Sequence, residues 1–241
     1  MPVYSNVTAK RDSHEVPCVL FEPRGGPRHC PGLIIAQHLP VAHAGLARDP
    51  FQMDVARRYA EAGYVCLMPF LFHHWPVDVP MSEKIHGFRD DWTVSDLKAS
   101  LDYLGRHPSV DSSRLGILGH CWGGRIAWLG AVNDCRIVAC VVFYAGRIKQ
   151  SFADGGTPPI NLASQMQSAF LGIFGNDDES PSISDVNDYE NALIAARINY
   201  EFHRFDGAGH GFQDFNNPER YRKTQSEEAW GLSLDFLSRN L

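Results

Sequence analysis

A cysteine between two glycines has the surroundings expected of a nucleophile. Residues 119–123, Gly-His-Cys-Trp-Gly, have the spacing of a nucleophile elbow, with Cys121 where serine is more usual. In an elbow the nucleophile occupies a strained turn between a strand and a helix, and the flanking glycines relieve crowding at the helix start. The positive end of that helix favours the thiolate. A cysteine packed in the core is the alternative, because this spacing also occurs by chance.

An acidic pair and a histidine follow the cysteine in the chain order that such a nucleophile needs. Asp177 and Asp178 come after the apolar run 169–174, and His210 comes after the run 200–205. Because parallel strands deliver the residues at their carboxyl ends to one edge of a sheet, we expect these side chains to meet. His210 would take the thiol proton, and an aspartate would orient its ring. Each residue has an ordinary turn or helix-entry explanation separately, but their order favours a catalytic triad.

The elements that would position these residues alternate along the chain. Short apolar runs, typical of buried strands, are separated by stretches with helical periodicity from residue 32 onwards. This alternation predicts an α/β fold with a mostly parallel central sheet flanked by helices on both faces. The expected strands are 16–21, 33–37, 64–68, 115–118, 137–143, 169–174 and 200–205.

Helical patterns fill the gaps between several of these strands. The stretches 51–62 and 94–104 each carry apolar residues along one face. Ser184 is the expected N-cap of a third helix. The last helix is expected to start at residues 217–219, Asn-Pro-Glu, which combine a capping side chain, proline at the first helical position and an early carboxylate.

The length of the chain bounds its domain organisation. Its 241 residues fit one α/β domain over 1–241, without a separate large cap. Two connections, 70–91 and 147–168, show neither a helical nor a strand pattern. Long irregular connections in a compact domain are often functional, so we expect both to shape the site.

Charge, hydropathy and cysteine usage disfavour several classes of protein. The net charge is −6 and no basic stripe is present, which disfavours nucleic acid and acidic membranes as partners. The first residues lack the apolar core of a leader, and no apolar run is long enough to span a membrane, so we expect a cytoplasmic location. The six cysteines are scattered without a C-x-x-C pair, which predicts mostly buried thiols and no disulfide framework. A monomer and a homodimer both remain open.

The sequence resembles the dienelactone hydrolase family of α/β-hydrolases over most of its length. The likeness rests on "GLIIAQHLP", "DVARRYAEAGYVCLMPFLF", "LGILGHCWGGRIA", "VVFYAG", "LGIFGNDD" and "GAGHGF", in that order. It implies the α/β-hydrolase fold, Cys121 as nucleophile and His210 as base. It also implies an aspartate at G-x-x-D spacing from Gly175, which selects Asp178 over Asp177 as the acid. The oxyanion hole would be formed by the backbone N–H groups of Trp122 and Leu39.

Three positions depart from the family pattern. The family ends its first long strand with Gln-Glu, whereas this chain has Gln37 and His38. His74 stands where the family supplies an arginine for a substrate carboxylate, and Asp214 stands where a second arginine is sometimes found. We therefore expect a substrate that lacks the usual carboxylate, and a His38–Asp214 pair in place of a glutamate–arginine pair.

The pocket is expected to combine histidines with aromatic rings. The expected lining is His38, Phe72, His74, Trp75 and Tyr144, with core packing as the alternative for some of the rings.

No metal and no cofactor are expected. His38 and His43 lie near the site in sequence, but no H-x-x-x-H or C-x-x-C clamp is present. The neighbours His73 and His74 should point in different directions, as adjacent residues usually do.

Together these residues predict an ester or lactone hydrolase that works through a covalent thioester on the cysteine and takes a small-molecule substrate. Two alternatives stay open at this point. One is a promiscuous hydrolase of other electrophiles, such as a phosphotriester or an activated aryl ester. The other is a binding protein that kept the fold and lost turnover.

Overall fold

The computed structural model describes residues 2–25, 29–39, 49–152 and 155–241, so His43 lies outside the described residues. Within these ranges the strands form one eight-stranded sheet in the order β1-β2-β4-β3-β5-β6-β7-β8. All neighbouring pairs from β4 to β8 are parallel, whereas β1 and β2 pair antiparallel, as do β2 and β4. The expectation of a mostly parallel sheet is confirmed. The strands are β1 Val3–Arg11, β2 His14–Glu22, β3 Cys30–Ala36, β4 Val65–Pro69, β5 Val110–His120, β6 Ile137–Phe143, β7 Ala169–Gly175 and β8 Tyr200–Phe205.

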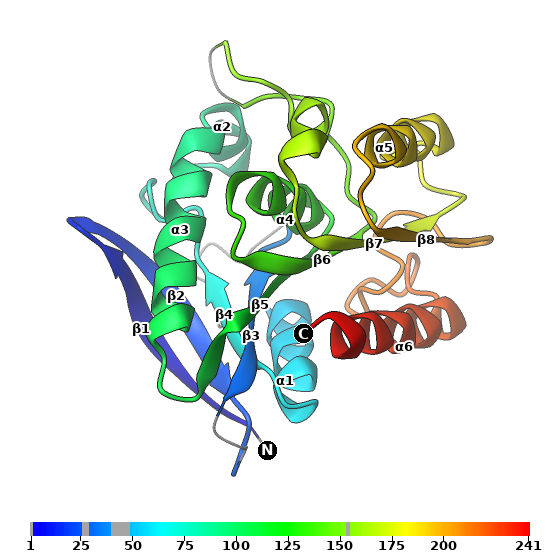
Figure 1. Ribbon diagram of the computed structural model, residues 1–241. Helices are drawn as coiled ribbons and strands as arrows, with labels where there is room; N and C mark the ends of the chain where they lie inside the picture. The colour runs from blue at the N-terminus through cyan, green and yellow to red at the C-terminus, as the bar shows by residue number, and fades with distance from the viewer. Residues whose placement is uncertain (1, 26–28, 40–48, 153–154) are drawn as a thin grey trace.

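Helices cover both faces of this sheet, as expected (Figure 1). Helices α3 (Asp90–Arg106), α4 (Trp122–Asn133) and α5 (Ile183–Ala195) lie on one face with the short α2 (Met81–His86). Helices α1 (Pro50–Glu61) and α6 (Lys223–Asn240) lie on the other. Each face buries its own apolar cluster. The central strands are therefore buried on both sides, which explains their continuous apolar runs.

Strand β1 is absent from the expected strands because its burial is slight. All but two of its residues are exposed, and only Ala9 is fully buried. Its sequence therefore has no apolar run. It forms an edge hairpin with β2, and the pairing from Val3–Glu22 to Arg11–His14 supplies the backbone hydrogen bonds that hold it.

Two expected helix starts are wrong. Helix α5 is capped by Ser182, not by Ser184, because Ser182 and Asp185 exchange hydrogen bonds in a capping box. Helix α6 starts at Lys223, not at residues 217–219. There the Asn217 carbonyl accepts the N–H groups of Arg220 and Tyr221, which closes a turn ahead of the helix.

The two long connections are partly ordered by short helices. Residues 70–91 include α2, and residues 147–168 include a 3₁₀ helix, η2 (Pro159–Gln165). Among the described residues, no helix is both long enough and apolar enough to cross a membrane.

Candidate active site

Cys121 occupies a strained turn between β5 and α4. Its backbone has φ 55° and ψ −121°, outside the regions that side chains ordinarily adopt. A Cβ at Gly119 would lie 2.0 Å from the Gly123 carbonyl oxygen, and one at Gly123 would lie 2.3 Å from the Ala36 carbonyl oxygen. Both glycines are therefore required for this turn. The elbow geometry expected from the spacing is present.

The structure brings Cys121, His210 and Asp178 into one hydrogen-bonded chain. His210 Nε2 lies 3.0 Å from the Cys121 sulfur, and His210 Nδ1 lies 3.0 Å from Asp178 Oδ2. The other oxygen of Asp178 accepts the Ser180 N–H at 2.8 Å. Asp177 is exposed, whereas the side chain of Asp178 is buried. The acid at G-x-x-D spacing is therefore the one that reaches the imidazole.

The surroundings of His210 favour its protonated form. Burial opposes the charge, but the contacts with Asp178 and Cys121 outweigh it and raise the pKa of His210 to about 10. An imidazolium at hydrogen-bond distance from a sulfur stabilises a thiolate. The pair is arranged for a reactive cysteine.

Trp122 and Leu39, whose N–H groups are expected to form the oxyanion hole, lie at the start of α4 and shortly after β3. Trp122 is the first residue of α4, where the N–H groups have no acceptor within the helix. Leu39 follows β3, and its segment is fixed from two sides. The His38 N–H donates to Gln52 Oε1 at 3.0 Å, and Gln37 Oε1 accepts the Leu71 N–H at 2.6 Å. An oxyanion hole formed by the N–H groups of Trp122 and Leu39 stays a prediction.

His38 pairs with Asp49, so the expected His38–Asp214 pair is wrong. His38 Nε2 lies 2.8 Å from Asp49 Oδ2, and the same carboxylate caps α1 through the Gln52 N–H at 2.9 Å. Burial raises the pKa of Asp49, but its contact with His38 outweighs this and leaves the pKa lowered. Asp214 instead accepts the Asn216 N–H at 2.9 Å. The sequence signal for Asp49 was the Asp-Pro pair, a capping residue before proline at a helix start.

The sulfur opens onto two adjoining cavities of about 470 Å³ and about 620 Å³. Cys121 and His210 line both, and these volumes suit a small-molecule ligand. Of the residues expected in the pocket, His38 and Tyr144 line the larger cavity, together with Leu39. The Tyr144 ring meets the His210 ring edge-to-face at 5.4 Å between centroids.

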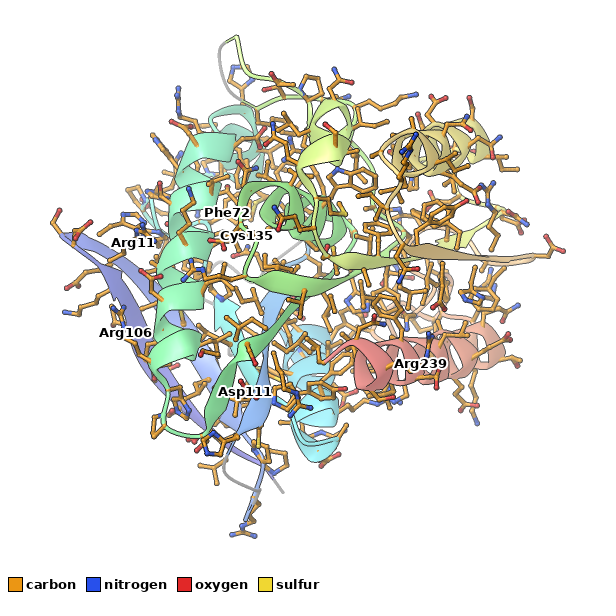
Figure 2. The ribbon with its side chains drawn as sticks, viewed as in Figure 1. Arg11, Phe72, Arg106, Asp111, Cys135 and Arg239 are labelled. Carbon is orange, nitrogen blue, oxygen red and sulfur yellow. The ribbon has the colours of Figure 1, made fainter. Side chains whose placement is uncertain are left out.

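The other expected pocket residues lie elsewhere. The described lining of the two cavities contains neither Phe72, nor His74, nor Trp75. Phe72, labelled in Figure 2, is buried in the apolar cluster that also contains residues of α3 and α4. Its ring centroid lies 5.8 Å from that of Trp75. His74 contacts Asp96 and the ring of Trp92. Phe72 is therefore a core residue and does not line the described part of the pocket.

His73 and His74 point to the same carboxylate, so the expectation that they diverge is wrong. Their Nε2 atoms lie 3.1 Å and 3.3 Å from the two oxygens of Asp96. They belong to a turn after β4 rather than to a strand, and a turn does not alternate side chains between two faces. His120, next to the nucleophile, is buried and stacks on Phe143.

Sequence reasoning missed the arginines of the smaller cavity. Arg147, Arg220 and Arg222 line it together with the acids Asp177, Asp178, Glu179 and Glu219. The Arg222 guanidinium donates hydrogen bonds to the backbone carbonyls of Gly207, Glu219 and Tyr221. The three arginines belong to no recognisable motif, so nothing in their spacing marked them.

A buried ion pair holds the segment that carries Arg147. The Arg125 guanidinium, fully buried in α4, contacts both oxygens of Asp90 at 2.7 and 2.9 Å. The same group donates to the carbonyls of Arg147 at 3.1 Å and Gln150 at 2.7 Å. Asp90 also accepts the Phe152 N–H at 2.9 Å. The start of the 147–168 connection is thereby fixed beside the cavity.

The remaining thiols differ from Cys121. Four of them, Cys18, Cys30, Cys66 and Cys140, are buried, and Cys135 is exposed. Burial raises the pKa of Cys18 to about 12 and also raises those of Cys66 and Cys140. Cys121 is the partly exposed thiol that contacts a histidine.

Comparison with known proteins gives a consistent family match. The model of the dienelactone hydrolase family matches residues 16–241. A Methylorubrum extorquens protein named "Putative carboxymethylenebutenolidase" is 29% identical over 88% of this chain and 72% of its own length. A Bradyrhizobium sp. protein named "Probable 2-oxo-3-(5-oxofuran-2-ylidene)propanoate lactonase" is 30% identical over 76% of each chain.

A solved structure shares the fold. It is named "Putative Dienelactone Hydrolase", from Klebsiella pneumoniae, and it is similar with a TM-score of 0.88 at 24% identity, covering 99% of both chains. The expected fold, an α/β-hydrolase sheet with helices on both faces, is confirmed.

Proposed function

Since the chain belongs to the dienelactone hydrolase family, we propose that it hydrolyses an ester or a lactone through a thioester on Cys121. The observation that carries the proposal is the chain of 3.0 Å contacts from the Cys121 sulfur through His210 to Asp178, beside two cavities. This arrangement provides a nucleophile, a base and a group that orients the base.

The first half of the reaction forms the thioester. The Cys121 sulfur attacks the carbonyl carbon, and the carbonyl electrons move onto the oxygen. The N–H groups of Trp122 and Leu39 donate to that oxygen. When the tetrahedral intermediate collapses, the bond to the leaving oxygen breaks and His210 supplies its proton. For a lactone, the released hydroxyl stays attached to the acyl group.

The second half releases the acid. His210, now neutral, takes a proton from water, and the resulting hydroxide attacks the thioester carbonyl. The carbon–sulfur bond then breaks, and the sulfur leaves as a thiolate beside the protonated imidazole. Asp178 keeps Nδ1 protonated throughout, so that Nε2 always faces the reacting atoms.

The charges of the smaller cavity support a substrate without a carboxylate. Three arginines face four acids there, and Arg222 already contacts carbonyl groups. The charges are therefore mixed, and among the described lining residues cations do not outnumber acids. A small uncharged ester or lactone fits this setting better than an anion, whose burial would require a dedicated partner.

Burst kinetics with p-nitrophenyl acetate tests the proposal. We expect a burst of nitrophenol equal to the enzyme concentration, abolished by Cys121→Ala. Asp178→Asn should lower kcat by about 10³- to 10⁴-fold, since it permits the wrong imidazole tautomer. The matched control is Asp177→Asn, at the exposed neighbouring position, and its kcat should fall far less.

Equal slow turnover in the parent and in Cys121→Ala would contradict the thioester route. A phosphotriester assay with the same proteins tests the alternative of a promiscuous hydrolase of other electrophiles. Preferential turnover of the triester over the ester would favour that alternative. Tight binding of an ester without any release of product would favour the non-catalytic alternative.

A further inference from the structure

Three histidine rings converge on one buried carboxylate outside the active site. His14 Nε2 lies 2.7 Å from Asp96 Oδ1, and His73 Nε2 lies 3.1 Å from the same oxygen. His74 Nε2 lies 3.3 Å from Asp96 Oδ2. None of these four residues belongs to the described lining of the catalytic cavities. They are called the histidine cluster below.

The cluster joins segments that are distant in sequence. His14 is the first residue of β2, His73 and His74 lie in the turn after β4, and Asp96 projects from α3. The side chain of Asp96 is 0% exposed, whereas that of His14 is 33% exposed. A fully buried acid therefore forms the base of the cluster, and the imidazoles form its accessible side.

The donor atoms suit a first-row divalent metal. The His14, His73 and Asp96 ligand atoms all lie within 4.8 Å of one another. Zinc bonds of about 2.0 Å in a tetrahedron separate neighbouring ligand atoms by about 3.3 Å. The 2.7 and 3.1 Å separations from Asp96 Oδ1 would lengthen by about 0.6 and about 0.2 Å to reach that value, and the two imidazole nitrogens lie within 4.8 Å of each other. Imidazole nitrogens with one carboxylate oxygen are a ligand set that zinc accepts.

We propose that His14, His73 and Asp96 form a binding site for a divalent transition-metal ion of the Zn²⁺ type. The ligands are the two Nε2 atoms and Asp96 Oδ1, and water completes the tetrahedron. Each ring then carries its proton on Nδ1, which leaves the Nε2 lone pair for the metal. His74 donates from Nε2 to Oδ2 and fixes the orientation of the carboxylate.

Such an ion would fasten the edge hairpin and the 70–91 connection to α3. Hydrogen bonds alone could also hold the cluster, with a proton on each Nε2 atom in place of the metal. The two arrangements differ in one testable respect. A glutamine in place of a histidine keeps an N–H donor for Asp96 but offers no imidazole nitrogen to a metal.

Calorimetric titration with ZnCl₂ tests the site, using protein without a histidine tag. The Cys121→Ser background removes the thiolate that would compete for zinc. We expect one ion per chain, and at least about 100-fold weaker binding after His14→Gln or His73→Gln, since even groups that only support a ligand are worth 10- to 100-fold. His86→Gln, an exposed histidine of α2 outside the cluster, is the control and should bind as its parent does.

A second readout identifies the ligands. Co²⁺ in the site should give visible ligand-field absorption without the charge-transfer bands of a thiolate, and His14→Gln should remove it. The absence of stoichiometric binding in the parent, or unchanged binding in both glutamine variants, would overturn the proposal. His14 is partly exposed at the start of its strand, so His14→Gln should keep the circular dichroism spectrum of the parent. A loss of metal binding in this variant would then reflect the lost ligand and not a change in folding.

Discussion

The protonation of His210 is set by its two hydrogen-bond contacts. Its Nδ1–H donates a hydrogen bond to Asp178, and its Nε2 contacts the Cys121 sulfur. Both contacts favour the imidazolium. The same two contacts that would drive catalysis also link the folded state to pH. His120, one residue before the nucleophile, shows the opposite case, because burial lowers its pKa to about 3 and keeps it neutral.

The stability of the protein should therefore carry a signature of His210. The folded protein holds this proton up to a pKa of about 10, whereas an unfolded histidine loses it near about 6.5. A raised pKa stabilises the folded state fully below the lower value and loses that effect as pH rises through the upper one. Urea unfolding of the parent and His210→Gln should show a stability difference that shrinks between pH 6 and pH 10. A difference that stays constant over this range would contradict it.

The residue scale is also where the sequence was most informative. Cys121, Asp178 and His210 could be found because each lies a few residues after the end of a parallel strand, and strand ends set their positions. The partner of His38 could not be found in this way. Whether His38 meets Asp49 or Asp214 depends on how α1 and the loop after β8 dock, and no local spacing encodes that docking.

The elements around the nucleophile impose a strict steric requirement. Strand β5, the elbow and α4 approach so closely that Gly119 and Gly123 leave no room for a side chain. Gly231 in α6 contrasts with them, because a Cβ there would meet no atom within 4 Å. The packing therefore requires glycine at position 119, whereas position 231 has room for a side chain.

Alanine at these two positions should have opposite effects. Gly119→Ala places a Cβ against the Gly123 backbone and should destabilise the protein by about 3 kcal/mol, since backbone must move to admit it. Gly231→Ala should stabilise it by about 0.5–1 kcal/mol, because alanine is the better helix former. Chemical denaturation of both variants checks this. Similar small effects would mean that the elbow tolerates a side chain.

Helix boundaries were less predictable than the strands. The Asn-Pro-Glu pattern at 217–219 has the composition of a helix start, yet it forms a turn that brings Glu219 and Arg220 to the cavities. The same residue types satisfy either structure, and tertiary contacts decide between them. The edge strand β1 was missed because an exposed strand needs no apolar run.

At the scale of the whole molecule, the site is assembled from strand ends and connections that only the fold brings together. The Arg125–Asp90 pair fixes the segment carrying Arg147, while a separate turn contributes Arg220. The loss of the expected arginine at His74 therefore does not leave the cavity without cations. We propose that the mixture of arginines and acids sets the substrate preference of this cavity, and no motif in the sequence marked the arginines.

This mixture makes a prediction about substrate charge. Methyl p-nitrophenyl succinate and its free-acid counterpart differ by one carboxylate and share the same scissile bond. We expect kcat/KM for the neutral ester to be higher by at least about tenfold, which is about 1.4 kcal/mol of transition-state binding. A preference for the anion that disappears in Arg147→Ala or Arg220→Ala would contradict the expectation and would assign these arginines to carboxylate binding.

The most direct test of the central claim is to identify the residue that carries the acyl group during turnover. The protein would be mixed with p-nitrophenyl butyrate, quenched in acid within the burst and analysed by mass spectrometry of its peptides. The account predicts one butyryl group on the peptide that contains Cys121, and none on the peptide with the exposed Cys135. Turnover with an acyl group elsewhere, or with no acyl-enzyme at all, would contradict it.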